Sequence, residues 1–252
     1  MNLIRDILYT LRQFGIDPIK SIESIRNLPR YFLGVIKFVR LKPENNISFL
    51  PSLNDFRSEA GSADGHYFWQ DLICAKWIYD AKPMSHADIG SRIDGFISSL
   101  LVFRSVDLID IRKLKNSIPN LNYKFGDIQS GFPNLEGKYD SVSSLHSIEH
   151  FGLGRYGDRF QVDGHEIGLR NISDLLKKEG SLYISFPIGN SKIQFNSQRI
   201  IHPLWPLSVL KNFTLEKFVL IPWKGDPVFD TTPTDVKINL KGQAGLYHFK
   251  KN

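Results

Sequence analysis

The sequence predicts an α/β fold with a mostly parallel sheet covered by helices on both faces. From residue 85 onward, short apolar runs alternate with amphipathic helical patterns, which is typical of strand–helix–strand units. The stretch His86–Gly95, H-A-D-I-G-S-R-I-D-G, turns sharply from strand to helix at glycine and brings backbone N–H groups close to a ligand. Asp88, Asp110 and Asp127 lie at or just after predicted strands, where parallel sheets bind their ligands.

Length and composition limit the class of protein. The 252 residues, 42% hydrophobic and 23% charged, suit one medium domain with an appendage or two small domains. The single cysteine, Cys74, excludes an internal disulfide, fits a reducing compartment and is expected to be buried on a helix. No stretch approaches the roughly 18 apolar residues of a membrane span, and the N-terminus lacks a signal-peptide pattern. We therefore expect a cytoplasmic protein.

The N-terminal segment reads as three short helices. Apolar residues at helical spacing predict the first helix over residues 3–14. Asp17-Pro18 supplies a cap and a first-turn proline for a second helix that ends near Leu28-Pro29. A third helix is expected over Arg30–Arg40, and Lys42–Asp64 reads as a linker.

Most of the positive charge belongs to this segment. Residues 1–42 hold eight Lys or Arg and three Asp or Glu, a net charge of +5 out of +6 for the whole chain. The helices either pack on the main domain with their charges in solvent, or contact an anionic membrane surface or a lipid-phosphate-linked substrate at the inner membrane face. Nucleic acid is not expected, because no aromatic–basic interleaving accompanies the charge. We divide the chain into a basic helical extension, residues 1–62, and a main domain, residues 63–252.

The main domain is expected to contain seven strands. A helix passes through Leu72 to Ile78, and two further helices are expected over Phe96–Phe103 and Glu166–Lys178. The predicted strands are Ser85–Ile89, Val106–Ile109, Tyr123–Phe125, Tyr139–Leu145, Ser181–Phe186, Phe213–Ile221 and Gly245–Lys250. Alternation of this kind brings the strand-end carboxylates into one crevice.

The residues of this crevice suit a nucleoside. Asp110 follows Asp88 by 22 positions, the spacing at which a carboxylate accepts both ribose hydroxyls. Asp127, after the third strand, is placed to receive an adenine amino group. The Gly90 turn is one residue short of the three-glycine dinucleotide fingerprint, and Arg92 fills a slot that a pyrophosphate keeps small. S-adenosylmethionine therefore fits better than NAD.

Residues 63–252 resemble the class I S-adenosylmethionine-dependent methyltransferases, which have a Rossmann-like, seven-stranded sheet closed by an antiparallel hairpin. Within that superfamily, four strings are similar to the domain of unknown function 268 (DUF268). They are G-H-Y-F-W-Q-D-L, D-I-G-S-R-I-D-G-F, S-L-H-S-I-E-H-F-G-L-G-R-Y-G-D and F-P-I-G-N-S-K-I-Q-F-N-S-Q-R-I. Similar proteins are associated with bacterial surface-polysaccharide synthesis, so the resemblance implies O-methylation of a sugar or lipid-linked glycan.

The resemblance and the strand ends together give an expected set of site residues. The expected cofactor-binding residues are Asp88, Gly90, Ser91, Asp110, Asp127, Ile128, Leu145 and His146. His150 is the expected base, with Glu149 orienting it or binding an acceptor hydroxyl. His66 and Tyr67 are expected to cover the cofactor, and His146 to pack against the nucleoside. The expected acceptor contacts are Arg155, Tyr156, Asp158, Asn196, Arg199 and His202.

Two other functions compete with methyl transfer. The second hypothesis, after methyl transfer, is a catalytically inactive, nucleoside-binding member of the same fold that acts in a polysaccharide-assembly complex. The string His146-Ser-Ile-Glu149-His150 also matches the H-x-x-E-H motif of zinc peptidases. A zinc hydrolase is the less favoured alternative, because Gly152 and Gly154 end the helix that this motif needs. We expect no metal.

Overall fold

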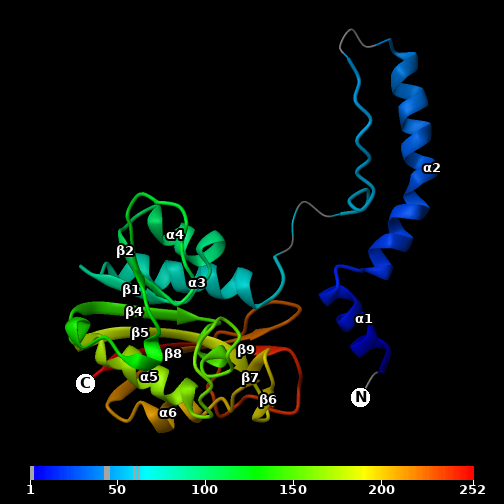
Figure 1. The fold of residues 1–252 in the computed structure, drawn as a ribbon. Helices are drawn as coiled ribbons and strands as arrows, with labels where there is room; N and C mark the ends of the chain where they lie inside the picture. Colours follow the sequence, from blue (N-terminus) through cyan, green and yellow to red (C-terminus); the bar gives the residue numbers. More distant parts are fainter. Residues whose placement is uncertain (1–2, 43–45, 59–60, 62) are drawn as a thin grey trace. The chain divides into compact units, whose positions relative to one another are not determined.

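The chain folds into two compact units, Met1–Ser62 and Ala63–Asn252. The structure is a computed structural model that describes residues 3–42, 46–58, 61 and 63–252 (Figure 1). Parts of the predicted linker, residues 43–45, 59–60 and 62, lie outside the described residues. The described remainder of that linker contains neither helix nor strand.

The described residues of the first unit form two helices rather than the predicted three. Helix α1 spans Leu3–Gln13, and helix α2 spans Pro18–Arg40. Asp17 caps α2 as predicted, and its carboxylate accepts hydrogen bonds from the backbone of residues 19 and 20. The predicted helix end at Pro29 is wrong. Proline removes one backbone donor from the helix, but α2 continues through it for another eleven residues.

The segment 46–58 runs back beside α2 (Figure 1). The Asn27 side chain donates to the Leu53 carbonyl at 2.6 Å, and the Arg30 guanidinium lies 4.5 Å from the centre of the Phe56 ring. These contacts are polar or partly exposed. They hold the segment to the helix without enclosing an apolar core.

The second unit is built on the predicted seven-stranded sheet. Its strands lie in the order β3-β2-β1-β4-β5-β9-β8, in which the first five are parallel and β9 is antiparallel to both neighbours. The strands are β1 His86–Ile89, β2 Val106–Asp110, β3 Leu121–Phe125, β4 Tyr139–Leu145, β5 Leu176–Ile188, β8 Phe213–Pro222 and β9 Gln243–Lys251. The order reverses between β1 and β4, so the crevice at this point is the expected place for a ligand.

Helices cover both faces of the sheet (Figure 1). One face is covered by α3, a π-helical turn η1 and α4, and the other by α5 and α6. These elements span His66–Ala81, Ile93–Ile97, Ser98–Leu101, Gly164–Asp174 and Trp205–Val209. The helix predicted over Phe96–Phe103 is thus replaced by the η1 turn and one turn of α-helix.

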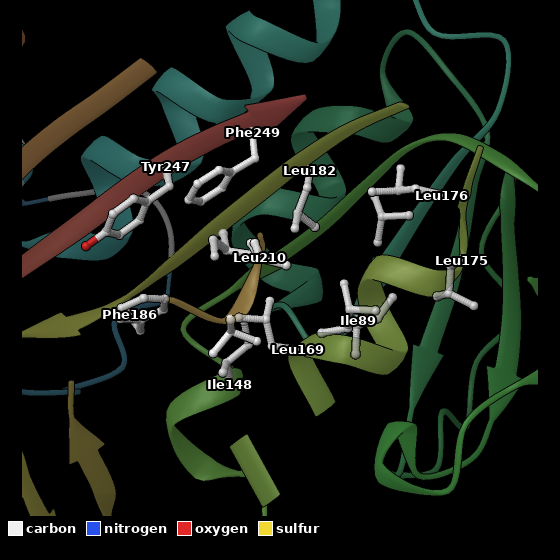
Figure 2. Packing of buried hydrophobic residues seen from close by; sticks show 14 of the residues in the cluster. Ile89, Ile148, Leu169, Leu175, Leu176, Leu182, Phe186, Leu210, Tyr247 and Phe249 are labelled. Atoms are coloured by element: carbon white, nitrogen blue, oxygen red, sulfur yellow. The ribbon is translucent and has the colours of Figure 1, made fainter. Parts of the chain in front are cut away.

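Alternating side chains of the strands supply two separate apolar clusters. In β5, Leu182 and Phe186 face the α5 side and belong to the cluster of Figure 2, which includes Leu169 of α5, whereas Tyr183 faces α3. Cys74 is fully buried on α3, as expected. Period-two alternation with both faces buried is what a sheet inside two helical layers requires.

The boundary between α5 and β5 differs from the prediction. The helix expected to reach Lys178 ends at Asp174, because backbone N–H groups of residues 137–139 donate to the carbonyls of Asp174 and Leu175. Pairing with the start of β4 therefore turns residues 176–180 into strand. The strand also runs past its predicted end at Pro187, which lies beyond Ser185, the last residue that pairs with β4.

Small elements complete the second unit. A hairpin of β6, Lys192–Gln194, and β7, Gln198–Ile200, was not predicted. Three single 3-10 turns follow β3 and β4, namely η2 Ile128–Ser130, η3 Pro133–Leu135 and η4 Ile148–His150. Among the helices of the described chain, none has the length and apolar character needed to cross a membrane.

Candidate functional site

The turn after β1 is held in place by Asp88. This carboxylate is fully buried and accepts hydrogen bonds from the Ser91 backbone at 2.9 Å, the Ser91 hydroxyl at 2.7 Å and the Ser143 hydroxyl at 2.5 Å. Burial raises the pKa of Asp88 to about 7, and these hydrogen bonds oppose the rise. The Ser91 hydroxyl in turn accepts from the Leu145 backbone at 2.9 Å. Asp88, Ser91 and Leu145 therefore shape the turn from behind and do not line the cavity beside it.

The two glycines of the turn have different structural roles. Gly90 has φ +71°, and a Cβ there would lie 2.5 Å from the Ser147 hydroxyl oxygen, so the backbone passes close to the β4 exit. Gly95 has ordinary φ, but a Cβ would lie 2.5 Å from a carboxylate oxygen of Asp71 on α3. Gly90 thus makes the turn, whereas Gly95 lets η1 approach α3.

A cleft of about 230 Å³ lies at the carboxyl ends of β1, β2, β3 and β4. The structure brings together here most of the strand-end residues named from the sequence. Those that line it are Gly90, Asp110, Asp127, Ile128, His146, His150, Tyr156 and Asp158. Ile89 and Ile109 add apolar walls to this polar lining.

Arg112 is a cavity residue that the sequence reasoning missed. Its backbone and Nε donate to one oxygen of Asp110 at 2.7 and 2.9 Å, and its Nη2 donates to the other at 2.5 Å. The same Nη2 reaches the Gly90 carbonyl at 3.0 Å, and the guanidinium lies 5.0 Å from the centre of the Tyr156 ring. The signal was available as D-I-R, an arginine two residues after the predicted ribose carboxylate.

The segment after β4 places two histidines at the cavity, but with partners other than those expected. Glu149 Oε1 lies 2.8 Å from His146 Nδ1 and 3.9 Å from His150 Nε2. His150 instead bonds the Ser197 carbonyl through Nδ1 at 2.7 Å. Of the two roles expected for Glu149, this geometry does not support orientation of His150, because the carboxylate hydrogen-bonds His146. Binding of an acceptor hydroxyl by Glu149 stays a prediction.

Residues at the start of α3 pack against His146. The His66 ring stacks on it with centroids 5.4 Å apart and planes 20° apart, and the Tyr67 ring lies 4.9 Å away. Burial lowers the pKa of His66 to about 4, so this ring is neutral at physiological pH. Tyr67 also lines the cavity, and the Arg92 guanidinium lies 5.1 Å from its centre.

The glycine-rich loop after η4 is braced by one of the residues predicted to bind the acceptor. The Asp158 carboxylate accepts from the backbone of Gly152, Gly154 and Tyr156 at 2.8, 3.1 and 3.2 Å. Tyr156, which is 37% exposed, also lines the cavity, and the Arg112 and Arg155 guanidiniums lie 5.0 and 5.2 Å from the centre of its ring. Arg155 does not line the cavity and donates to the Ser197 carbonyl at 2.9 Å.

The three acceptor contacts predicted after β5 do not reach the cavity. Arg199 is 3% exposed and donates to backbone carbonyls, at 2.5 Å to Phe151 and at 3.0 Å to Val162. Asn196 lies in the turn of the β6–β7 hairpin with φ +58°, and His202 accepts from the Leu204 backbone at 3.2 Å. Arg199 thus ties the β6–β7 hairpin to the segment after η4.

The geometry does not support the zinc-hydrolase alternative. Only residues 148–150 are helical, in a single 3-10 turn, so His146 and His150 do not lie one α-helical turn apart. In the parts of the chain that the structure describes, no group of three or more His, Cys, Asp or Glu side chains is arranged to hold a metal ion.

One protein family matches part of the chain. Residues 100–214 match the model of a family described as "Caenorhabditis protein of unknown function, DUF268". This confirms the resemblance read from the strings after β4 and at the end of β5, whereas the two earlier strings lie outside the matched range. No curated protein matches the sequence.

Solved structures resemble the second unit. The 1,6-didemethyltoxoflavin-N1-methyltransferase of Burkholderia thailandensis, crystallised with 1,6-didemethyltoxoflavin and S-adenosylhomocysteine, is 13% identical with a TM-score of 0.51, over 73% of this chain and 78% of that one. The [4+2]-cyclase SpnF is 10% identical with a TM-score of 0.51, over 72% of this chain and 81% of that one. At these identities the likeness concerns the fold alone, and the two names show that one fold serves different reactions.

Proposed function

For a chain with the class I methyltransferase fold and a match to the DUF268 family over residues 100–214, we propose that the function is S-adenosylmethionine-dependent methyl transfer. The observation that carries this proposal is the meeting of Gly90, Asp110 and Asp127 in one cavity at the switch in strand order. Each comes from a different strand end, as the binding of a nucleoside in such a sheet requires.

The chemistry of the cavity wall fits the proposed cofactor. Asp110 would hold the ribose hydroxyls, Asp127 the adenine amino group, and Ile128 one face of the ring. The Gly90 turn would let the backbone approach the cofactor closely. When bound, the cofactor supplies an electrophilic methyl group. The chain's own task is to hold the acceptor oxygen in line with that group and to take its proton.

We propose a hydroxyl of a sugar or glycan as the acceptor. This rests on the family resemblance and is supported by the exposed Tyr156 ring at the cavity, since aromatic faces pack well on the apolar faces of sugar rings. Arg155, Asp158, Arg199 and His202 are engaged with backbone groups, and Asn196 does not line the cavity, so Tyr156 is the loop residue to test.

A nucleoside-binding protein without methyl transfer is the second candidate. It is favoured by the occupation of both Asp110 oxygens by Arg112, and by the similar fold of a protein named as a cyclase. Binding alone does not distinguish the two functions. A transfer assay does.

The experiment begins with calorimetric titration of the full chain with S-adenosylmethionine and S-adenosylhomocysteine. Binding in the micromolar range is expected, with a loss of at least tenfold in Asp110→Asn. Absence of binding to both ligands would contradict the proposal. Tritiated S-adenosylmethionine is then incubated with lipid-linked glycan and soluble glycan fractions. Incorporation supports the transferase, and binding without incorporation into any fraction favours the second candidate.

We further propose that residues 1–42 contact an anionic membrane surface. The segment is basic, and it exposes apolar side chains such as Phe14, just after α1, and Ile25 on α2, which are 77% and 65% exposed. Flotation with phosphatidylcholine vesicles, with and without phosphatidylglycerol, tests this. The full chain should float only with anionic vesicles, and the 1–42 deletion with neither. Equal recovery of both proteins would refute the contact.

A further inference from the structure

His146 has a strained backbone at a functional position. Its φ is +49°, and among the described non-glycine residues with positive φ it alone lines the cavity. The left-handed region costs an ordinary residue about 1–2 kcal/mol. The hydrogen bond from the His146 N–H to the Ser185 carbonyl at 2.8 Å and the side-chain contacts hold the residue there. Strain of this kind is retained where it places a side chain for a purpose.

The His146 side chain forms a buried pair with Glu149. Nδ1 lies 2.8 Å from Glu149 Oε1, and the two side chains are 4% and 1% exposed. A carboxylate at this distance accepts the Nδ1 proton, which fixes the ring in one tautomer and leaves a lone pair on Nε2. Stacking on His66 and contact with Tyr67 fix the plane of the ring.

The far atom of each side chain lacks a partner. His146 Nε2 and Glu149 Oε2 are buried, and neither has a hydrogen-bond partner in the described structure. A buried polar atom without a partner costs about 1–3 kcal/mol, so two in one pair at a cavity wall call for an explanation. A ligand hydroxyl that donates to Nε2 would satisfy the first of them.

His150, the base expected from the sequence, is less suited to this role. Its Nδ1 bonds a backbone carbonyl, and its Nε2 is 3.9 Å from the carboxylate, too far for a hydrogen bond. Burial lowers the pKa of His150, which weakens it as a proton acceptor. It lacks a bonded carboxylate to stabilise a positive charge on the ring.

We propose that His146 accepts the proton of the acceptor hydroxyl at Nε2, and that Glu149 is its positioning residue. As the acceptor oxygen bonds the methyl carbon, the carbon–sulfur bond breaks with its electron pair left on sulfur, and the hydroxyl proton passes to Nε2. Glu149 stabilises the resulting imidazolium, which later loses the proton to solvent. This assignment rests on the proposed methyl transfer.

The test compares His146→Gln, Glu149→Gln and His150→Gln in the full chain, with S-adenosylhomocysteine as the calorimetric probe. Because His146 is assigned to the acceptor side and not to the nucleoside, His146→Gln should keep the affinity within about threefold. A tenfold loss of affinity in that variant would make His146 a nucleoside contact and overturn the assignment. In any glycan fraction methylated by the wild type, kcat should fall by about 100-fold or more in His146→Gln. Glu149→Gln should show a smaller fall with KM little changed, and a larger loss in His150→Gln than in His146→Gln would overturn the assignment.

Nitrogen-15 spectra of the histidines give a readout that needs no acceptor. His146 should carry its proton on Nδ1, and Glu149→Gln should weaken or reverse that preference. A proton on Nε2 in the wild type would overturn the inference, since that atom is then unable to accept another. If the wild type binds neither S-adenosylmethionine nor S-adenosylhomocysteine, the proposed function fails, while the spectra still report whether the histidine–carboxylate pair exists.

Discussion

The two units of this chain differ in what holds them together. The second unit encloses two apolar clusters between sheet and helices. Among the described side chains of the first unit, none that is apolar is buried, and the most buried residue is Asn27 at 9% exposure. Helices gain most of their stability from packing an apolar face. The second unit is therefore stabilised by its own apolar clusters. The first unit presents apolar helix faces that contact with a partner surface would stabilise.

We expect the largest effect on the free energy of unfolding when one phenylalanine of each unit is replaced by alanine. Phe186→Ala, in the fully buried cluster of Figure 2, should lower the free energy of unfolding by about 3–5 kcal/mol. Phe32→Ala, at a side chain 57% exposed on α2, should change it by less than about 0.5 kcal/mol. All four tryptophans lie after residue 62, so urea unfolding followed by tryptophan fluorescence reports the second unit. Equal losses in the two variants would remove the distinction.

Acid should affect the second unit and spare the first. Burial lowers the pKa of His86 to about 3, so as pH falls from 7 to 5 the unfolded chain, with a histidine pKa near 6.5, binds a proton that the folded chain does not. Stability is therefore lost, by about 2 kcal/mol for this group at pH 5. The histidines with the same direction and a pKa of about 4 are His66, His165 and His248.

Two carboxyls oppose this trend. Burial raises the pKa of Asp88 to about 7 and of Asp71 to about 6, so the folded chain gains protons, and stability, over the same range. Four histidines against two aspartates predict a net loss of stability by pH 5 in tryptophan-detected unfolding. The first unit contains no histidine, so the helical circular dichroism of a 1–62 peptide bound to vesicles should not change between pH 7 and 5. A stability that rises toward pH 5 would contradict the balance.

Alanine substitution of two glycines with similar backbone angles should give a smaller effect on stability. Gly90 and Gly15 have φ of +71° and +78°, so alanine strains either by about 1–2 kcal/mol. Only at Gly90 would the new Cβ also meet a neighbour, the Ser147 hydroxyl. Gly90→Ala should lower both the tryptophan-detected midpoint of thermal unfolding and the affinity for S-adenosylhomocysteine. Gly15→Ala strains only the first unit, which has no tryptophan, and should leave both readouts unchanged. Unchanged affinity in Gly90→Ala would show that the turn does not touch the ligand.

The smallest effect concerns ligand affinity within the second unit. A carboxylate has about four acceptor sites, and Arg112 takes three on Asp110, so two ribose hydroxyls require the guanidinium to withdraw. Arg112→Met should raise the affinity for S-adenosylhomocysteine by up to about tenfold, since that competition is lost. Arg170→Met, whose parent side chain pairs with Glu166 and does not line the cavity, serves as the matched control and should leave the affinity unchanged. A fall in Arg112→Met would mean that Arg112 holds Asp110 in its binding position.

The sequence by itself determined the sheet, because apolar alternation is a local property of each strand. It predicted all seven strands, their helical layers and the strand ends at which Gly90, Asp110 and Asp127 meet. It also identified the cap at Asp17, which depends on neighbours two and three residues away. Such features require no knowledge of distant parts of the chain.

Only the tertiary structure decided which polar residues face the cavity and which brace it. Asp88 and Asp110 both lie at the ends of predicted strands. The Asp88 carboxylate, however, is buried and accepts a hydrogen bond from Ser143 on β4. Arg199 donates to a backbone carbonyl of a distant loop. The Glu149 carboxylate hydrogen-bonds His146 and lies too far from His150 to do the same. The end of α5 was likewise decided by residues 137–139. Partners of this kind are set by chain segments far apart or by the exact direction of a side chain, and neither is written in a local pattern.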